Sequence, residues 1–425
     1  MVNKKLKVGN VPNLRFPGFI DDWKMVSLGE VAEFKVTNSF SRDNLNYDNG
    51  TVKNIHYGDI HTKFQTLFDI TKETVPYINK EIVLHKISED FYCKEGDIIF
   101  ADASEDLNDV GKSIEIINLN DEKILSGLHT LLARPKANCF QKGFNGYLFR
   151  SSSVRLQIQK EAQGSKVLSI NVSRISKVIL CFPTLVEQQK IASFLSLIDE
   201  RIQTQNKIIR ELNVLKTINT GRMFSGQLKF KKNNGDNYLD WTTRKLKDVT
   251  SLVNKRNKGN EKLTVYSINN KLGFVPQNEQ FDGIDSEDRG YDIKLYKVID
   301  KNIFAYNPAR INVGSIGYSG ELENIIISSL YVCFKTDDSV SDNFLLHYLK
   351  SDLFNKEVLR NVEGGVRDYL FYENFARIKF MLPSIEEQHR IANFLSSLDK
   401  KIDIETQLLQ KLEEQKKFLL QQMFV

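Results

Sequence analysis

The sequence predicts an α+β protein built twice from one plan: two globular, mixed α/β domains, each followed by a long helix. Two observations predict this class. A helix-forming segment occurs twice, and its second copy lies 200 residues after the first without a gap. The stretches before each copy contain short β-branched and aromatic runs bounded by Gly, Asn and Asp, which are typical of strands. Repetition at a fixed offset indicates an internal duplication.

The helical segment is closely similar in its two copies. Of the twenty-one positions from 182 to 202, ten are identical to the residues 200 positions later. An N-cap residue, Thr184 or Ser384, is followed three positions later by Glu187 or Glu387. This spacing is that of a capping box, which predicts a helix start. We expect Gly221 to end the first helix.

Apolar residues of both copies recur at alternating spacings of four and three, as in the seam of a coiled coil. One polar residue, Gln205 or Glu405, interrupts the seam at the same place in each copy; it either fixes the register or is simply tolerated. An isolated helix of this kind exposes apolar surface, so we expect the two to pair antiparallel about a pseudo-two-fold axis, as a rod of roughly 55 Å. The seam consists of Ile191, Leu195, Ile198, Ile202, Ile209 and Leu212, and of Ile391, Leu395, Leu398, Ile402, Leu409 and Leu412.

The repeat divides the chain into four parts. They are a first globular domain (1–183), a first long helix (184–221), a linker with a second globular domain (222–383) and a second long helix (384–425). Trp23 and Trp241 are the two tryptophans of the sequence and stand at equivalent domain entrances. We interpret them as core anchors. Short connections favour mostly antiparallel strands within each domain.

Composition excludes several classes of protein. A hydrophobic content of 41% and a charged content of 27% describe an ordinary globular chain. The N-terminus lacks a secretory pattern and no apolar run reaches the length of a membrane span, so we expect a cytoplasmic protein without a membrane partner. The four cysteines are far apart and the six histidines have no ligand spacing, so we expect reduced thiols and no metal.

Catalytic motifs are also missing from the sequence. An amino-methyltransferase needs an Asn/Asp-Pro-Pro-Tyr/Phe motif, and the nearest match, Asn307-Pro308-Ala309-Arg310, lacks it. Neither a Walker A loop nor a paired-carboxylate nuclease motif occurs. We therefore expect no catalytic residue in this chain. Residues 222–262 contain eleven Lys and Arg against four Asp and Glu, which suits either a DNA contact or a solvated linker.

The doubled segment Pro-[Thr/Ser]-x-x-Glu-Gln-x-x-Ile-Ala-x-Phe-Leu-Ser-x-x-Asp, at 183–199 and 383–399, resembles the conserved region of the specificity (S) subunit of type I restriction–modification systems. The entrance 14–23 and the run 306–314 are also similar to that family, so the resemblance covers the whole chain. It implies two target-recognition domains, each reading one half of a bipartite, asymmetric site in double-stranded DNA. It further implies that the seam helices form an antiparallel coiled coil that docks two adenine-N6 methyltransferase (M) subunits.

Partners and cofactors follow from the same resemblance. Restriction (R) subunits would complete an ATP-dependent endonuclease, and S-adenosylmethionine, ATP and Mg would be bound by the partner subunits, with no cofactor on this chain. Two alternatives stay open. The methyltransferase and nuclease could be fused on one companion chain, or the protein could be a coiled-coil scaffold that does not bind DNA.

Base readout favours Arg, Lys, Asn, Gln and Ser/Thr side chains, and phosphate contacts favour Arg and Lys. Two places in each domain match this chemistry: a loop after a central strand and a Gly-started stretch before the long helix. For each residue, a solvated loop charge is an equally open interpretation. The DNA-binding candidates are Lys112, Ser113, Lys166 and Arg174 in the first domain, and Lys255, Arg256, Lys258, Arg310, Asn312, Ser315, Arg367, Tyr369 and Arg377 in the second.

Overall fold

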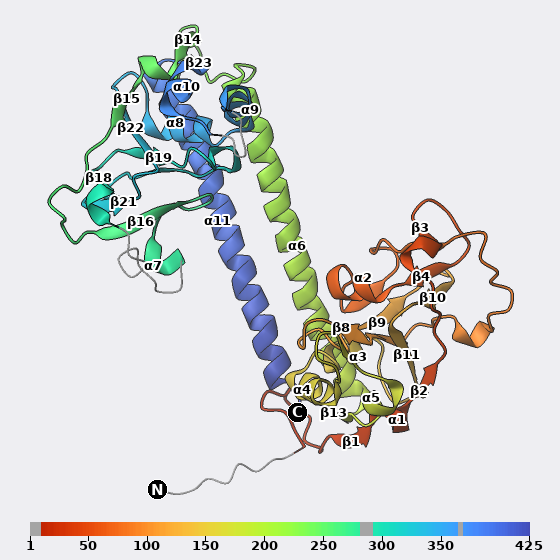
Figure 1. The fold of residues 1–425 in the computed structure, drawn as a ribbon. Helices are drawn as coiled ribbons and strands as arrows, with labels where there is room; N and C mark the ends of the chain where they lie inside the picture. Colours follow the sequence, from red (N-terminus) through yellow and green to blue (C-terminus); the bar gives the residue numbers. More distant parts are fainter. Residues whose placement is uncertain (1–9, 281–291, 364–368) are drawn as a thin grey trace, which may run out of the picture. The chain divides into compact units, whose positions relative to one another are not determined.

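The computed structural model describes residues 10–280, 292–363 and 369–425 (Figure 1). The chain forms two compact units, Met1–Asn206 with Leu408–Val425, and Lys207–Gln407. The two long helices are α6 (Leu185–Phe224) and α11 (Ile385–Gln422). Each unit therefore combines one globular domain with the beginning of one long helix and the end of the other. The α+β class and the internal repeat are confirmed.

The first unit contains two main sheets. The inner sheet has the order β2-β11-β7-β9-β5, and the outer sheet the order β10-β4-β6-β3. Two small sheets pair β1 with β13 and β8 with β12. The strands are β1 (Lys24–Ser27), β2 (Ala32–Lys35), β3 (Leu45–Asn46), β4 (Lys53–Ile55), β5 (Leu67–Asp69), β6 (Tyr77–Ile78), β7 (Ile98–Ala101), β8 (Ala103–Ser104), β9 (Ser113–Asn118), β10 (Ile124–Ser126), β11 (Thr130–Pro135), β12 (Leu168–Ser169) and β13 (Ile179–Phe182). The short helices are α1 (Leu28–Val31), α2 (Tyr57–Thr62), α3 (Phe144–Leu148), α4 (Ser152–Glu161) and α5 (Val172–Ile175).

The second unit repeats this plan. Its inner sheet, β15-β22-β19-β20, corresponds to β2-β11-β7-β9, and its outer sheet has the order β17-β16-β21-β18. The strands are β14 (Thr242–Lys245), β15 (Thr250–Val253), β16 (Thr264–Asn269), β17 (Gly273–Pro276), β18 (Lys297–Ile299), β19 (Phe304–Tyr306), β20 (Ile316–Tyr318), β21 (Ile325–Ile327), β22 (Val332–Thr336) and β23 (Lys379–Leu382). The short helices are α7 (Gln277–Gln280), α8 (Asp342–Leu349), α9 (Asp352–Asn361) and α10 (Tyr372–Arg377).

The pairing of the strands is mostly antiparallel, as the short connections predict. Each unit also has a parallel pair in its outer sheet, β4 with β10 and β16 with β21. A second parallel pair joins β5 to β9 in the first unit. The equivalent parallel pairs show that β4 and β16 are counterparts, although the sequences of these strands are unrelated.

One hydrophobic core in each unit joins the inner sheet to the long helices. In the first unit, Ile191, Leu195 and Ile198 of α6 share a core with Leu419 and Met423 of α11. In the second unit, Ile391 and Leu395 share the core with Met223 and Phe224. Trp23 and Trp241 are buried in these cores, which confirms that they are anchors. The first seam residues of each helix are therefore core residues and are not exposed for docking.

The ends of the two helices pack antiparallel within each unit. In the first unit the start of α6 shares a core with the end of α11, and the Lys416 ammonium of α11 lies 2.5 Å from the Asp199 carboxylate of α6. In the second unit Lys216 forms the equivalent ion pair with Asp399. The expected stop at Gly221 is wrong: α6 continues through it to Phe224. A helix tolerates one glycine, and Phe224 is fixed in the core.

The expected capping box is present in part: the Glu387 amide donates to the Ser384 hydroxyl at 3.4 Å, but both glutamate carboxylates tie their helix to its globular domain. Glu187 is 1% exposed and accepts two hydrogen bonds from the Arg15 guanidinium, at 2.7 and 2.8 Å. Glu387 is 0% exposed and accepts from the Trp241 indole at 2.8 Å and from the Phe230 amide at 3.1 Å. Because a buried carboxylate needs partners, these residues hold the domain entrances in place.

The neighbouring glutamines make a second tie, which is the same in both units. The Gln188 amide donates to the carbonyls of Cys139 and Pro183 and accepts from the Gln141 amide. Gln388 makes the corresponding bonds with Ser339, Pro383 and Ser341, each of which lies 200 positions after the equivalent partner of Gln188. The Glu-Gln pair of the repeated segment thus has a structural role.

Candidate nucleic-acid interface

Both domains place polar loops at the ends of equivalent strands. In the first unit, the chain leaves β4 through His56 and enters α2, beside the loop that follows β7. His61 of α2 contacts the carbonyl of Ala103, the first residue of β8 just after this loop, at 2.9 Å. In the second unit, the loop after β16 lies beside the loop after β19, because the Ser315 hydroxyl donates to the Ile268 carbonyl at 3.2 Å. Each domain therefore has one such edge, here called the strand-end surface.

The strand-end surface of the second unit surrounds an open cavity of about 410 Å³. Its polar lining includes Asn269, Asn270, Lys271, Asn307 and Arg310. Two of the amides fix their own loops: the Asn269 oxygen accepts from the Lys271 amide at 2.8 Å, and the Asn307 oxygen accepts from the Ala309 amide at 3.0 Å. Amide and guanidinium groups are the side chains that read base edges.

Buried groups hold this surface in shape. The Tyr331 hydroxyl accepts from the Ile268 amide at 3.3 Å, while Ser315 donates to the carbonyl of the same residue. Burial is the main cause that raises the pKa of Tyr331, and the charge of Arg310 opposes the rise. Ser315 is 1% exposed. Its hydroxyl is therefore a bracing group, which argues against the prediction that it contacts DNA.

The other candidates of the second unit are dispersed. Lys255 forms an ion pair with Asp300 at 2.8 Å, and Arg256 and Lys258 are exposed around the buried Asn257. Asn312 is half-buried and Arg377 is exposed at the end of α10. Tyr369 stacks on Phe371 with ring centroids 5.7 Å apart. Arg367 lies outside the described residues. Of the predicted residues, only Arg310 and Ser315 line the cavity.

The strand-end surface of the first unit has different chemistry. Tyr57 is surrounded by the rings of His56, His61 and His129, with centroids at 4.6, 6.0 and 5.3 Å. His129 also lies 3.2 Å from the Asp102 carboxylate, whose pKa is raised by burial. Sequence reasoning missed this aromatic group. The only local signal was His56-Tyr57, because the fold alone brings His129 next to them.

Of the predicted residues of the first unit, Lys112 contacts this group, and most of the others are engaged elsewhere. The Lys112 ammonium donates to the His61 carbonyl at 2.7 Å and lies 3.4 Å from Asp109. Ser113 is 2% exposed within the inner sheet, which argues against a contact with DNA. Arg174 pairs with Glu161 at 3.4 Å, and Lys166 is exposed.

One backbone hydrogen bond links the residue after each Gly-started stretch to the loop after the central strand. The amide of Ile170, after the Gly-started stretch, donates to the Asp102 carbonyl at 2.8 Å. The equivalent amide of Leu370 donates to the Pro308 carbonyl at 3.1 Å. The residue that follows the Gly-started stretch therefore joins the loop after the central strand in both units, while residues 364–368 of the second stretch lie outside the described residues.

Metal and membrane sites are not found in the part of the chain that the structure describes. None of its His, Cys, Asp and Glu side chains form a group of three suited to a metal ion. In the same ranges, every helix is too short or too polar to cross a bilayer. All four cysteines have free thiols.

Comparison with known proteins decides the family. Residues 20–214 and 238–414 match the family model for the type I restriction modification DNA specificity domain. The chain belongs to this family. Both matched stretches contain a globular domain and part of a long helix, so the family domain occurs twice here and accounts for the repeat.

Two curated relatives come from Methanocaldococcus jannaschii. The putative type I restriction enzyme MjaX specificity subunit is 26% identical, over 97% of this chain and 93% of the relative. The type I restriction enzyme MjaVIII specificity subunit is 24% identical, over 64% of this chain and 67% of the relative. Both relatives are described as specificity subunits, in agreement with the family.

Solved structures share the fold of this family member. The S subunit of a type I restriction-modification system from M. genitalium has a TM-score of 0.56 at 15% identity, covering 98% of this chain and 99% of that chain. A chain from a study of complex assembly and conformational transition in a type I R-M system has a TM-score of 0.58 at 15% identity, covering 96% and 98%. The two recognition domains on long helices are therefore the fold of known S subunits.

Proposed function

We propose that this chain selects the DNA sequence on which a type I restriction–modification complex acts, with each strand-end surface reading one half of a bipartite, asymmetric site. The observation that carries the proposal is the contrast between these surfaces on a repeated frame. Amides and Arg310 line one, and Tyr57 with three histidines forms the other. Unlike surfaces on one frame suit unlike half-sites. A scaffold would not need them, and both domains match a DNA specificity family.

Arg310 is the residue for which base readout is best supported. It is exposed, lines the amide cavity and has a guanidinium fork suited to the O6 and N7 atoms of guanine. Lys271 of the same lining and the exposed Arg256 and Lys258 of the same unit supply positive charge suited to the flanking phosphates. Lys166 and Arg377 remain proposed phosphate contacts in their respective domains.

The helices are proposed to dock two methyltransferase subunits through seam residues beyond the domain cores. Ile209, Leu398, Ile402 and Leu409 are half-buried in this chain, whereas Ile202 packs against the first core. The chain itself is the non-catalytic member of the complex. S-adenosylmethionine, ATP and Mg are proposed to be bound by the methyltransferase and restriction subunits, in the cytoplasm, where the DNA lies. A fused companion enzyme would use the same seam.

Methylome sequencing of a host that expresses this chain with its neighbouring methyltransferase gene tests the proposal. We expect one new N6-methyladenine motif, split into two short, unlike halves by a fixed gap. An assembled complex that produces no new motif would refute DNA selection. Purification of the assembled complex distinguishes separate methyltransferase and restriction subunits from a fused companion by the masses of the chains.

A further inference from the structure

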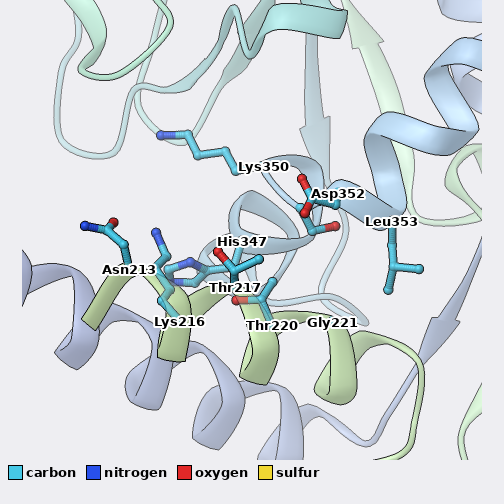
Figure 2. Close-up of a pocket in the computed structure, with 10 residues that line it drawn as sticks. Asn213, Lys216, Thr217, Thr220, Gly221, His347, Lys350, Asp352 and Leu353 are labelled. Atoms are coloured by element: carbon cyan, nitrogen blue, oxygen red, sulfur yellow. The ribbon is translucent and has the colours of Figure 1, made fainter. Parts of the chain in front are cut away.

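A cavity of about 190 Å³ opens in the second unit between α6 and the corner that joins α8 to α9 (Figure 2). Lys216 and Thr220 line it from α6, and His347, Lys350 and Ser351 line it from the corner. It shares no lining residue with the amide cavity of the strand-end surface. In Figure 1, α6 and α7, which belong to the two linings, lie on different sides of this domain.

Groups that can donate hydrogen bonds surround this cavity. Lys216 and Lys350 contribute ammonium groups, which Figure 2 shows on the same side of the cavity. The hydroxyl of Thr220 is buried and finds no hydrogen-bond partner among the residues that the structure describes. The first amides of α9 also lie here, at Asp352 and Leu353, and a helix leaves such amides without an intrahelical acceptor. A buried polar group without a partner is costly, so the lining is suited to an acceptor from outside.

The charges of the lining favour an anion. Lys216 already pairs with Asp399, which also lies 3.8 Å from His347. Lys350 has no ion pair within the described part of the chain, and burial together with the charge of Lys216 lowers its pKa. Asp352 extends away from Lys350 in Figure 2. An added carboxylate would offset the repulsion between the two lysines.

The first unit retains the charged groups of this site at the equivalent positions, although Leu420 stands in the place of Thr220. Arg150 stands in the place of Lys350, and Lys416 and Asp199 repeat the ion pair. The Nε atom of Arg150 is buried without a partner among the described residues, and burial lowers the pKa of its guanidinium. The strand-end surfaces differ completely between the units, whereas this basic corner is kept. Two unlike DNA half-sites would not require the same basic group in both units. A partner protein that binds in two identical copies would require it.

We propose that the corner between α8 and α9, with its counterpart at Arg150, receives an acidic side chain from each of two copies of one protein partner. The partner is the methyltransferase, so this inference rests on the proposed function. The side-chain carboxylate would accept from Lys350 and Thr220 in the second unit and from Arg150 in the first. Its recognition is charge-assisted, which makes it stronger than a neutral hydrogen bond.

Charge reversal in the full chain tests the proposal. Lys350→Glu is compared with Lys356→Glu, a control on an exposed position of α9. Titration of each purified chain with the purified methyltransferase gives the affinity of each binding step. The mass of the complex gives the number of methyltransferase copies bound. We expect Lys350→Glu to weaken one of the two binding steps at least tenfold, and the control to change it less than twofold. Thr220→Val, which removes only the hydroxyl, should weaken the same step by a few-fold.

Three readouts complete the test. Thermal unfolding shows whether each variant is folded. Arg150→Glu should weaken the other methyltransferase binding step, so the chain with both Lys350→Glu and Arg150→Glu should bind neither methyltransferase copy tightly. Equal methyltransferase affinity for Lys350→Glu and Lys356→Glu would overturn the proposal. So would a loss of DNA affinity with methyltransferase binding intact, because a DNA phosphate would then fill the cavity. A wild-type complex that assembles but binds no bipartite site would refute the proposed function alone.

Discussion

In the first unit, Glu187 accepts two hydrogen bonds from the Arg15 guanidinium, whereas in the second unit Glu387 accepts from the Trp241 indole and the Phe230 amide. Both glutamates are buried at equivalent helix starts. The Trp23 indole nitrogen, left without this acceptor, has no hydrogen-bond partner among the described residues. The acceptor has been kept through the duplication, and the donor has changed.

A second pair of positions shows the same behaviour. Tyr147 donates to Asp199 at 2.8 Å in the first unit, and His347 occupies the equivalent place near Asp399 in the second. The carboxylate and its lysine partner are unchanged. The comparison indicates that the long helices supply a fixed set of acceptors, against which each globular domain has evolved its own donors.

The largest loss of stability is expected when a charge is placed at a seam position that is buried in the first unit and only half-buried in the second. Ile198 is 8% exposed in the first core, while Leu398 is half-buried. Ile198→Asp should lower the free energy of unfolding of the first unit by about 3–5 kcal/mol, from lost packing and a buried charge. Leu398→Asp should lower the free energy of unfolding of the second unit by about 1–2 kcal/mol, because the side chain at this position is partly accessible to water. Trp23 fluorescence during denaturant unfolding, in a Trp241→Phe background, reports the first unit.

The same variants test the docking role of the seam. Leu398→Asp should lose methyltransferase assembly at protein concentrations and temperatures where the chain is folded. Ile198→Asp changes a core position that is not exposed for docking, so it should still assemble where it is folded. A folded Leu398→Asp chain that assembles with two methyltransferases like the wild type would remove the middle of the seam from the docking surface.

Removal of the helix-start glutamates should distinguish their two kinds of donor. Glu387→Ala leaves the Trp241 indole buried without an acceptor, so the second unit should lose about 2–4 kcal/mol of stability. Glu187→Ala leaves Arg15, which can turn toward water, so the first unit should lose about 1–2 kcal/mol. Differential scanning calorimetry on both variants checks the order. Equal losses would show that the identity of the donor is unimportant.

The strand-end surfaces should be separable in a methylation assay. Arg310→Ala should raise the barrier to methylation at the cognate site by about 1–3 kcal/mol and relax the second half-site only. Lys335→Ala, at an exposed position of β22 in the same domain, is the matched control. Rates on duplexes with single changes in either half give the result. A change in preference at the first half-site would contradict separate reading.

The smallest effect concerns pH. Burial lowers the pKa of His347 from 6.5 to about 4, so the folded chain does not take up the proton that the unfolded chain binds below pH 6.5. The contribution of His347 to the free energy of unfolding of the second unit is therefore fully present above pH 6.5. Between pH 6.5 and pH 4 it falls by about 1.4 kcal/mol for each unit by which the pH is lowered. His347→Tyr, the residue of the first unit, should remove this contribution. Unfolding at pH 7.5 and 5.5 should show a difference of about 1 kcal/mol between the variants.

The frame of the molecule could be predicted from the sequence because its signals are local and repeated. The heptad spacing, the offset of 200 and the two tryptophans identify the helices and the domain entrances without knowledge of the fold. The carboxylate half of the capping box is missing for a tertiary reason: Glu187 and Glu387 have the right spacing, but distant donors offer them buried hydrogen bonds.

The strand-end surfaces could be predicted only in part. Arg310 stands out because it is a basic residue in a Gly-containing loop. Ser315 of the same loop and Ser113, which proves to be the first residue of β9, are buried. Residues at the two ends of the aromatic group, Tyr57 and His129, are 72 positions apart, and no periodicity connects them. Only the pairing of the strands makes them neighbours.

The glutamine ties have a consequence for how new specificities arise. Within the described part of the chain, the side-chain hydrogen bonds of Gln188 and Gln388 go to main-chain groups. In the domains these are the carbonyls of Cys139 and Ser339 and the amides of Gln141 and Ser341. The side chains at these positions differ between the two units, yet the bonds are the same. Such a coupling accepts any domain whose backbone arrives in the right place, whatever its sequence. Recombination can therefore exchange whole readers between chains and leave the joint with the rod intact.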